Sequence, residues 1–157
     1  MIYMIWAMDE NRLIGNGDKI PWHVREDLIY YKNRTRGQTV LMGEATYYSL
    51  KGYYKDKPLP YKTIYVASLT KDLQLEDAIV VSDIHEFLSR PREECVWVVG
   101  GATIYELALP YAHRLYISFI KGEHTGDKYF PAFDFSKYRL IWSEEGKQVR
   151  YTIYERI

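Results

Sequence analysis

The apolar positions along the chain predict strands and helices in alternation. Residues 2–8 and 96–99 are almost continuously apolar, which is typical of strands that are covered on both faces of a sheet. We therefore expect these two strands at the centre of the fold. Between them, the pattern predicts a helix over 25–35, a strand over 39–42, a short helix over 45–50, and strands over 63–67 and 79–81.

The second half of the chain continues the alternation of helices and strands and then ends in two consecutive strands. Asp83 opens a helix with Glu86 three residues later, which is a capping-box pattern. A further helix is predicted to end near Pro110, and a strand follows over 115–120. The segments 138–143 and 148–157, joined across 144–147, are typical of an antiparallel hairpin.

These elements predict an α/β fold. We expect a single domain over residues 1–157, with a central, mostly parallel β-sheet, helices on both faces and a C-terminal antiparallel hairpin at the edge of the sheet.

Charge and composition narrow the class of protein. Basic and acidic residues both number 21, so the formal net charge is zero and no broad field favours a nucleic acid or a membrane surface. Cys95 is the only cysteine, which fits a reducing cytosol. No apolar run approaches the roughly 20 residues of a membrane span. We expect a cytoplasmic monomer that binds neither nucleic acid nor membrane.

One acidic residue stands out after a glycine-rich loop. Residues 13–22 contain two glycines and Pro21, as expected of a mobile lid. Asp27 follows in the next helix, with Tyr31 on the same helical face. Partial burial there would raise the carboxyl pKa toward neutrality, which suits a group that holds or relays a proton. The alternative is a first-turn aspartate that only complements the helix dipole.

Two strand ends carry glycines. Gly100-Gly101 links the strand 96–99 to a helix, and Gly43 ends the strand over 39–42. Such turns let backbone N–H groups approach a pyrophosphate at a helix N-terminus. Each signal alone is weak, because the full GxGxxG pattern is absent.

Taken together, the motifs resemble the dihydrofolate reductase family. They are Pro21-Trp22, Asp27 on the next helix, Met42-Gly43 with Thr46, Pro58-Leu59-Pro60, the VVGGATIY segment at 98–105, and GDKYFP at 126–131. The resemblance covers essentially the whole chain. It implies reduction of 7,8-dihydrofolate to 5,6,7,8-tetrahydrofolate by hydride transfer from a reduced nicotinamide dinucleotide, within one-carbon metabolism, and hence a target of antifolates.

The resemblance also implies roles for individual residues. Asp27 and Trp22 would be catalytic, with Asp27 facing the pteridine ring, and Asp127 would support the closed lid. The substrate would contact Ile5, Ala7, Leu28, Tyr31, Leu50, Lys62, Val99 and Tyr105. The cofactor would contact Ala7, Ile14, Ile20, Gly43, Glu44, Ala45, Thr46, Ser68, Gly100, Gly101, Ala102, Thr103, Ile104 and Tyr105.

The cofactor's 2′-phosphate site departs from the family pattern. Relatives place basic residues where this chain has Glu44 and Thr103. A carboxylate there would repel a phosphate by about 1 kcal/mol at surface dielectric, yet could accept a hydrogen bond from a free ribose hydroxyl. Ser68, Thr70 and Lys71 could supply a partial phosphate site. NADPH is the cofactor that the family implies, and Glu44 leaves NADH open as an alternative.

The substrate's glutamate tail is the second departure. Relatives hold it with an arginine shortly after the PLP-like segment, where this chain has Lys62, a point charge without bidentate geometry. Lys32 and Arg34 are secondary candidates, and each of the three could equally be an ordinary surface cation. Tyr31 stands where phenylalanine is more usual, and its hydroxyl needs a partner.

Other functions remain as alternatives. The four histidines show no ligand spacing with one another or with Cys95, so no metal is expected. The chain could reduce another pterin-like or ribosylamino-pyrimidine substrate, although Asp27 directly after the PW loop argues against this. A non-catalytic folate- or nucleotide-binding protein would show a missing acid or a damaged lid, and neither is visible.

Overall fold

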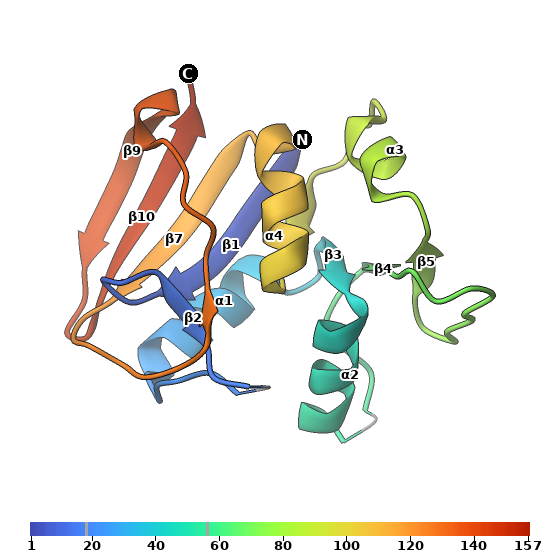
Figure 1. Ribbon diagram of the computed structural model, residues 1–157, viewed down its shortest axis with the longest axis horizontal. Coiled ribbons are helices and arrows are strands. Elements are labelled where there is room, and N and C mark those ends of the chain that lie inside the picture. Colours follow the sequence, from blue (N-terminus) through green and yellow to red (C-terminus); the bar gives the residue numbers. More distant parts are fainter. Residues whose placement is uncertain (18, 56) are drawn as a thin grey trace.

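The architecture is one eight-stranded sheet with helices packed on it (Figure 1). The computed structural model describes residues 1–17, 19–55 and 57–157. The strands are β1 (Ile2–Met8), β2 (Leu13–Gly15), β3 (Thr39–Gly43), β4 (Thr63–Ala67), β5 (Ile79–Val81), β6 (Val96–Val98), β7 (Arg114–Ile120), β8 (Lys128–Tyr129), β9 (Tyr138–Glu145) and β10 (Val149–Arg156). The helices are α1 (Arg25–Thr35), α2 (Glu44–Tyr53), α3 (Ile84–Ser89) and α4 (Ala102–Ala108), with 3-10 turns at Leu109–Tyr111 and Phe135–Lys137.

The strand order confirms the predicted centre of the sheet. The order is β5-β4-β3-β6-β1-β7-β10-β9, so the two continuously apolar strands, β6 and β1, lie side by side in the middle. All neighbours from β5 to β7 are parallel. The last two strands form the predicted hairpin, in which β10 pairs antiparallel with both β7 and β9.

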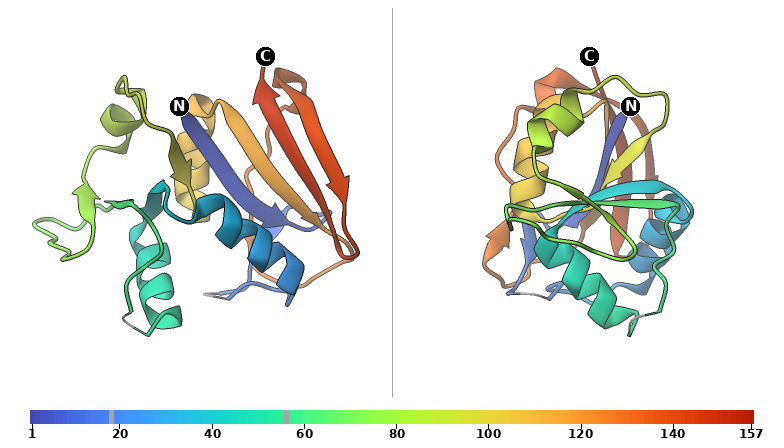
Figure 2. Two further views of the ribbon diagram at one scale, coloured as in Figure 1. Left: turned by 180° about the vertical axis from the view of Figure 1, so that it is seen from behind. Right: turned by 90° about the vertical axis from the view of Figure 1, so that its right-hand side faces the viewer.

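Helices cover both faces of the sheet, as predicted. Alternate residues of β1 point to opposite faces, so Met4 and Trp6 pack with the α3 and α4 side while Ile5 packs with the α1 and α2 side. In Figure 1, α4 lies in front of the sheet and α1 behind it, and the rear view in Figure 2 shows α1 in front. The sheet therefore separates two apolar cores.

Two local features differ from the prediction. The helix α2 continues to Tyr53, three residues past the predicted end at Leu50, and β2 and β8 form a small separate sheet that was not predicted. The Asp83 cap is confirmed, because its side chain accepts a hydrogen bond from the Glu86 N–H (3.0 Å). No helix in the described part of the chain is long and apolar enough to cross a membrane.

The connection after β7 is anchored in the core by aromatic stacking. Phe130, which follows β8, is fully buried and stacks on Trp6 of β1 with ring centroids 4.0 Å apart and planes nearly parallel. This contact fixes the late connection beneath α4 and places β8 beside β2.

The β2–β8 sheet ties the lid loop to this connection. The Gly17 N–H donates to the Asp127 carboxylate (2.8 Å), and the Asp127 N–H donates to the Gly15 carbonyl (3.1 Å). Gly126 makes this approach feasible, because a Cβ at that position would lie 2.3 Å from the Gly15 carbonyl oxygen. The two loops therefore meet through backbone contacts that leave no room for a side chain.

We predict that Gly126→Ala destabilises the protein, since the added methyl group forces the two loops apart. The free energy of unfolding should fall by about 1–3 kcal/mol, as for other overpacked sites, and urea denaturation measures it. Gly52→Ala is the matched control, because no atom lies within 4 Å of its added Cβ. Its free energy of unfolding should change by less than about 1 kcal/mol. Equal losses in the two variants would contradict the proposed clash.

Candidate active site

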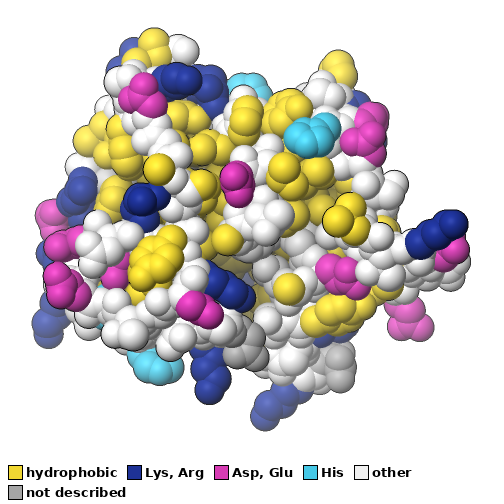
Figure 3. Space-filling model, viewed as in Figure 1, with side chains coloured by type: hydrophobic (Ala, Val, Ile, Leu, Met, Phe, Trp, Pro, Cys, Tyr) yellow, Lys and Arg dark blue, Asp and Glu magenta, His cyan; other side chains and the backbone are white. Residues whose placement is uncertain are grey.

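The carboxyl ends of the central parallel strands meet at one edge of the sheet, where open α/β folds place their ligands. Gly43 ends β3 and Gly100 follows β6, and the Gly43 N–H donates to the Gly100 carbonyl (2.8 Å). The Gly100–Gly101 peptide bond is cis. In the space-filling view the face is hollowed beside the lower end of α4 (Figure 3).

Glycines let the two turns at this edge pack closely against neighbouring side chains. Gly100 has a φ of +129°, and a Cβ there would lie 3.4 Å from the Tyr105 hydroxyl and 3.5 Å from Thr46 Oγ1. A Cβ on Gly101 would also meet Thr46 Oγ1, at 3.4 Å, and one on Gly43 would lie 2.9 Å from Ile104. Larger residues at these positions would therefore force the turns away from Thr46, Tyr105 and Ile104.

Asp27 is the acid of the site. It lies in the first turn of α1 and is half-buried. Burial raises the pKa of its carboxyl to about 6, and the nearby Glu26 carboxylate adds to the rise, whereas a hydrogen bond from Ser118 opposes it. The carboxyl can therefore hold a proton near neutral pH, and this observation favours the catalytic interpretation over the helix-dipole alternative.

Ser118 is a site residue that the sequence reasoning missed. It lies in β7, is 2% exposed and donates a hydrogen bond to Asp27. The available signal was a single small polar residue, Ser118, within the run 115–120 of large apolar and aromatic residues. Glu26 was also missed; its carboxylate accepts a hydrogen bond from the Gln148 N–H (2.9 Å) and ties α1 to the turn of the C-terminal hairpin.

An apolar cluster of side chains lies on the face of the sheet that α1 and α2 cover. Ile5, Val99, Tyr31 and Leu50 belong to one apolar cluster, although they come from four separate segments. Tyr105, from the opposite face, donates its hydroxyl to the Ile5 carbonyl (2.8 Å). The structure thus brings together most of the predicted substrate-binding residues, while Leu28 lies at the surface with 39% of its area exposed.

The lid residues divide into a buried and an exposed group. Trp22 is buried and makes an edge contact with the ring of His124 (centroids 5.3 Å apart), and Ala7 packs against the same cluster. Ile14 packs against the core on the α4 side. Ile20 is 62% exposed, so it is available to contact a ligand.

Glu44 is held in place by two hydroxyl groups. One of its carboxylate oxygens accepts hydrogen bonds from Ser68 Oγ (2.7 Å) and Thr70 Oγ1 (3.0 Å). Ser68 in turn accepts a hydrogen bond from the Thr70 N–H (2.9 Å). The hydroxyls that could have contacted a phosphate are therefore engaged by a carboxylate. The other predicted contacts at these strand ends are half-buried Ala102 and exposed Ala45 and Thr103.

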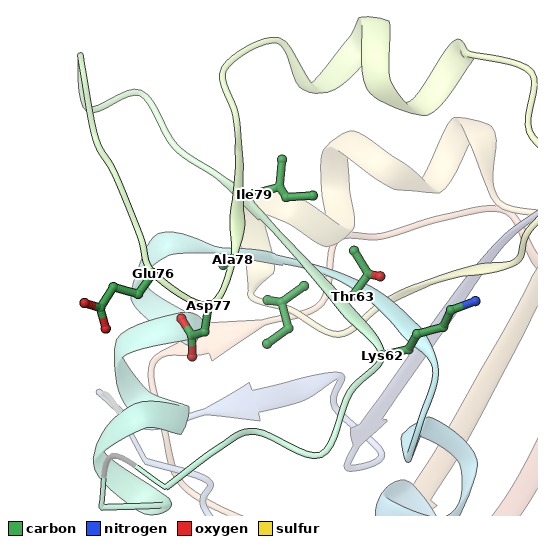
Figure 4. A pocket seen from close by; sticks show the side chains of 7 residues that line it. Lys62, Thr63, Glu76, Asp77, Ala78 and Ile79 are labelled. Atoms are coloured by element: carbon green, nitrogen blue, oxygen red, sulfur yellow. The ribbon is translucent and has the colours of Figure 1, made fainter.

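The structure does not bring Lys62 together with the apolar cluster. Lys62 is exposed and lines a surface hollow at the edge of the sheet with Glu76 and Asp77, and its side chain points away from both carboxylates (Figure 4). Tyr61, one residue earlier, lies with its hydroxyl 3.1 Å from that of Tyr31. The role of Lys62 in binding the tail thus stays a prediction that the geometry does not favour.

Arg34 and Lys32, the other two cations considered for the substrate's glutamate tail, lie in different surroundings. The Arg34 guanidinium lies over the rings of Tyr30, Tyr116 and Trp142, on the hairpin side of α1. Lys32 instead reaches toward the end of α2. Among residues 1–17, 19–55 and 57–157, no three His, Cys, Asp or Glu side chains form a group that could hold a metal ion.

Fold and site together define an α/β enzyme with a half-buried acidic residue at the carboxyl edge of a parallel sheet. The family model for dihydrofolate reductase matches residues 1–156. Dihydrofolate reductase from Bacillus subtilis (strain 168) is 42% identical over 149 residues, covering 93% of this chain and 84% of that protein. The chain belongs to the dihydrofolate reductase family.

Two further relatives match this chain over nearly its full length and over nearly all of their own. Dihydrofolate reductase from Mycoplasma pneumoniae is 34% identical and covers 100% of this chain and 99% of that protein. The structure of the Enterococcus faecalis dihydrofolate reductase, complexed with NADP(H) and RAB-propyl, superimposes with a TM-score of 0.88 at 29% identity, covering 99% of this chain and 96% of that chain. The predicted family and fold class are confirmed.

We predict that Asp27→Asn stabilises the protein above pH 6. Below pH 3.8 the carboxyl is protonated in both the folded and unfolded chain, so it has no effect on stability. As the pH rises toward 6 the unfolded chain ionises first, and above 6 the full cost of ionisation in the folded state opposes folding. At pH 7.5 the free energy of unfolding of the variant should exceed that of the natural protein by about 1–3 kcal/mol, given about 1.4 kcal/mol per pKa unit.

Urea denaturation of both proteins at pH 7.5 and pH 3.5 measures this difference. The stabilisation should be present at the higher pH and largely absent at the lower one. A variant that is equally or more stabilised at pH 3.5 would show that Asp27 opposes folding for a reason other than its charge.

Proposed function

We propose that this chain reduces 7,8-dihydrofolate to 5,6,7,8-tetrahydrofolate, with Asp27 as the acid and a nicotinamide dinucleotide as the reductant. The observation that carries the proposal is the raised pKa of Asp27, about 6, on the face of the sheet where Ile5, Val99 and Tyr31 form an apolar cluster. The family membership supports it.

Asp27 explains how the substrate's ring would be oriented and activated. A carboxyl group beside apolar side chains can hydrogen-bond the amino group and ring nitrogen of a pteridine. A proton held there near neutral pH promotes protonation of the imine nitrogen, and the protonated imine accepts hydride at the adjacent carbon far more readily than the neutral imine does. Ser118 positions the carboxyl through its hydrogen bond.

The residues at the strand ends fit a nicotinamide dinucleotide. Gly43, Gly100 and Gly101 form close backbone turns at the ends of β3 and β6, and the Thr46 and Tyr105 hydroxyls lie beside them. When bound, this cofactor supplies the hydride. Trp22, Ile20 and the loop held by Asp127 would exclude water from the reacting atoms, which favours hydride transfer over side reactions.

We further propose that the chain discriminates weakly between NADPH and NADH. Glu44 places a negative charge at the position where relatives hold the 2′-phosphate, and it engages the hydroxyls of Ser68 and Thr70. A 2′-phosphate would have to overcome this repulsion, whereas a free 2′-hydroxyl could donate to the carboxylate. Lys71 is exposed and follows Thr70 directly in the sequence. Its positive charge would offset part of the repulsion between Glu44 and a 2′-phosphate.

The reaction is tested by the loss of reduced-nicotinamide absorbance with dihydrofolate. We predict that Asp27→Asn lowers kcat by about 10²–10⁴-fold, the usual contribution of a general acid. In the natural protein, the rate of hydride transfer should fall about tenfold per pH unit above about 6, because the protonated fraction of Asp27 falls. Unimpaired turnover in the variant would overturn the role of Asp27, and a folded protein without turnover would overturn the reaction.

A second prediction concerns the cofactor. Glu44→Arg should raise the NADPH-to-NADH ratio of kcat/KM by about tenfold or more, because the 2′-phosphate gains a charge-assisted contact and loses a repulsion. Glu44→Gln is the matched control, since it keeps the side-chain length and removes only the charge. Its ratio should lie between those of the natural protein and the arginine variant. Three equal ratios would show that residue 44 does not contact this part of the cofactor.

A further inference from the structure

Trp22 lies where the backbone gives it little support. It ends the lid loop before α1, and residues 22–24 belong to neither a helix nor a strand. Its side chain is nevertheless only 7% exposed and packs with Ile120, Val149 and Tyr151. The position of this ring therefore depends on side-chain contacts rather than on a regular hydrogen-bond ladder.

The half-buried ring of His124 contacts Trp22 from the connection between β7 and β8. The two ring centroids are 5.3 Å apart and the planes meet at 64°, an edge-to-face arrangement that aromatic pairs favour. His124 Nε2 lies 3.3 Å from the Lys121 carbonyl oxygen, and because a carbonyl only accepts, Nε2–H is the donor. This hydrogen bond orients the imidazole, so that His124 meets Trp22 in one orientation.

A buried carboxylate fixes the backbone of His124. Asp9 follows β1 directly and is 1% exposed. One of its carboxylate oxygens accepts hydrogen bonds from the N–H groups of Asn11 (2.9 Å) and Leu13 (3.0 Å), and the other accepts from the His124 N–H (3.2 Å). These bonds compensate the carboxylate for its lost hydration. Asp9 therefore joins the turn between β1 and β2 to the residue that contacts Trp22.

The contact of His124 lies at a different point of the lid loop from the contacts of Asp127. Asp127 meets Gly15 and Gly17 in the first half of the loop, whereas His124 meets Trp22 at its last residue. The same connection thus holds the lid loop at two points. Loss of the His124 ring would free Trp22 while the Asp127 hydrogen bonds remain.

We propose that His124 is a positioning residue for hydride transfer, because its ring holds Trp22 in place before α1, the helix that carries the acid. The proposal rests on the proposed function, in which Trp22 helps to exclude water from the reacting atoms. His124 acts through Trp22 and needs no contact with either ligand. Its aromatic ring carries this role, so another aromatic ring can replace it.

Tryptophan fluorescence tests the contact without requiring turnover. The difference between each protein and its Trp22→Phe counterpart isolates the emission of Trp22 from that of the other tryptophans. In His124→Gln, which lacks the ring, quenching of this emission by acrylamide should rise about threefold or more, because the aromatic contact is lost. His124→Phe keeps the contact and should quench like the natural protein. The matched control is His85→Gln, which replaces an exposed histidine of α3 and should leave the emission of Trp22 unchanged.

Kinetics test the role of the contact in the reaction. The single-turnover rate of hydride transfer should fall about tenfold in His124→Gln, since small misplacements near reacting groups are costly, while KM for dihydrofolate changes less than about threefold. His124→Phe should restore the rate. An equal fall in rate in His124→Phe would overturn the proposal, and so would a change in KM in place of the change in rate.

The two measurements keep the two proposals apart. If the natural protein oxidises neither NADPH nor NADH with dihydrofolate, the proposed reaction and the role of His124 in it are overturned, and quenching still decides whether His124 holds Trp22. Equal quenching in the natural protein and in His124→Gln, both folded by circular dichroism, would show that it does not. Altered quenching with an unchanged rate of hydride transfer would overturn the positioning role.

Discussion

The structure depends on the burial of β6 between β1 and β3. This strand has only three residues, yet all of them are buried, and it pairs in parallel on both sides. A parallel strand of this kind requires apolar cover on both faces, which is why helices lie on each side of the sheet. The cover ends where the strands end, and there Gly43 and Gly100 can approach each other closely. The site exists because the central strands stop together at an edge that the helices do not close.

The same edge combines apolar surroundings with a few polar groups. Burial raises the pKa of Asp27, while the Ser118 hydroxyl limits the rise. Such an environment opposes folding and supports proton transfer at the same time.

The sequence predicts the large elements well and the short contacts poorly. Continuous apolar runs identify β1 and β6, and Asp83 identifies the start of α3, because these signals are local. The strands β2 and β8 have three and two residues, too few for any periodicity to be recognised. The extension of α2 through Gly52 and Tyr53 was missed because glycine disfavours helix in isolation. The surroundings of Lys62 could not be predicted either, because the direction of its side chain depends on the backbone hydrogen bond between Lys62 and Gln38.

The stacking of Trp6 on Phe130 has a consequence for the motion of the lid. The connection after β7 would be a long loop with many accessible conformations if it were attached only at its ends. Phe130 anchors it near the middle, so only the span from residue 121 to residue 129 remains to move with β2. Because the entropic cost of ordering a loop grows with its length, holding this short span beside β2 costs little conformational entropy. The core contact therefore lets a few hydrogen bonds keep the two loops together.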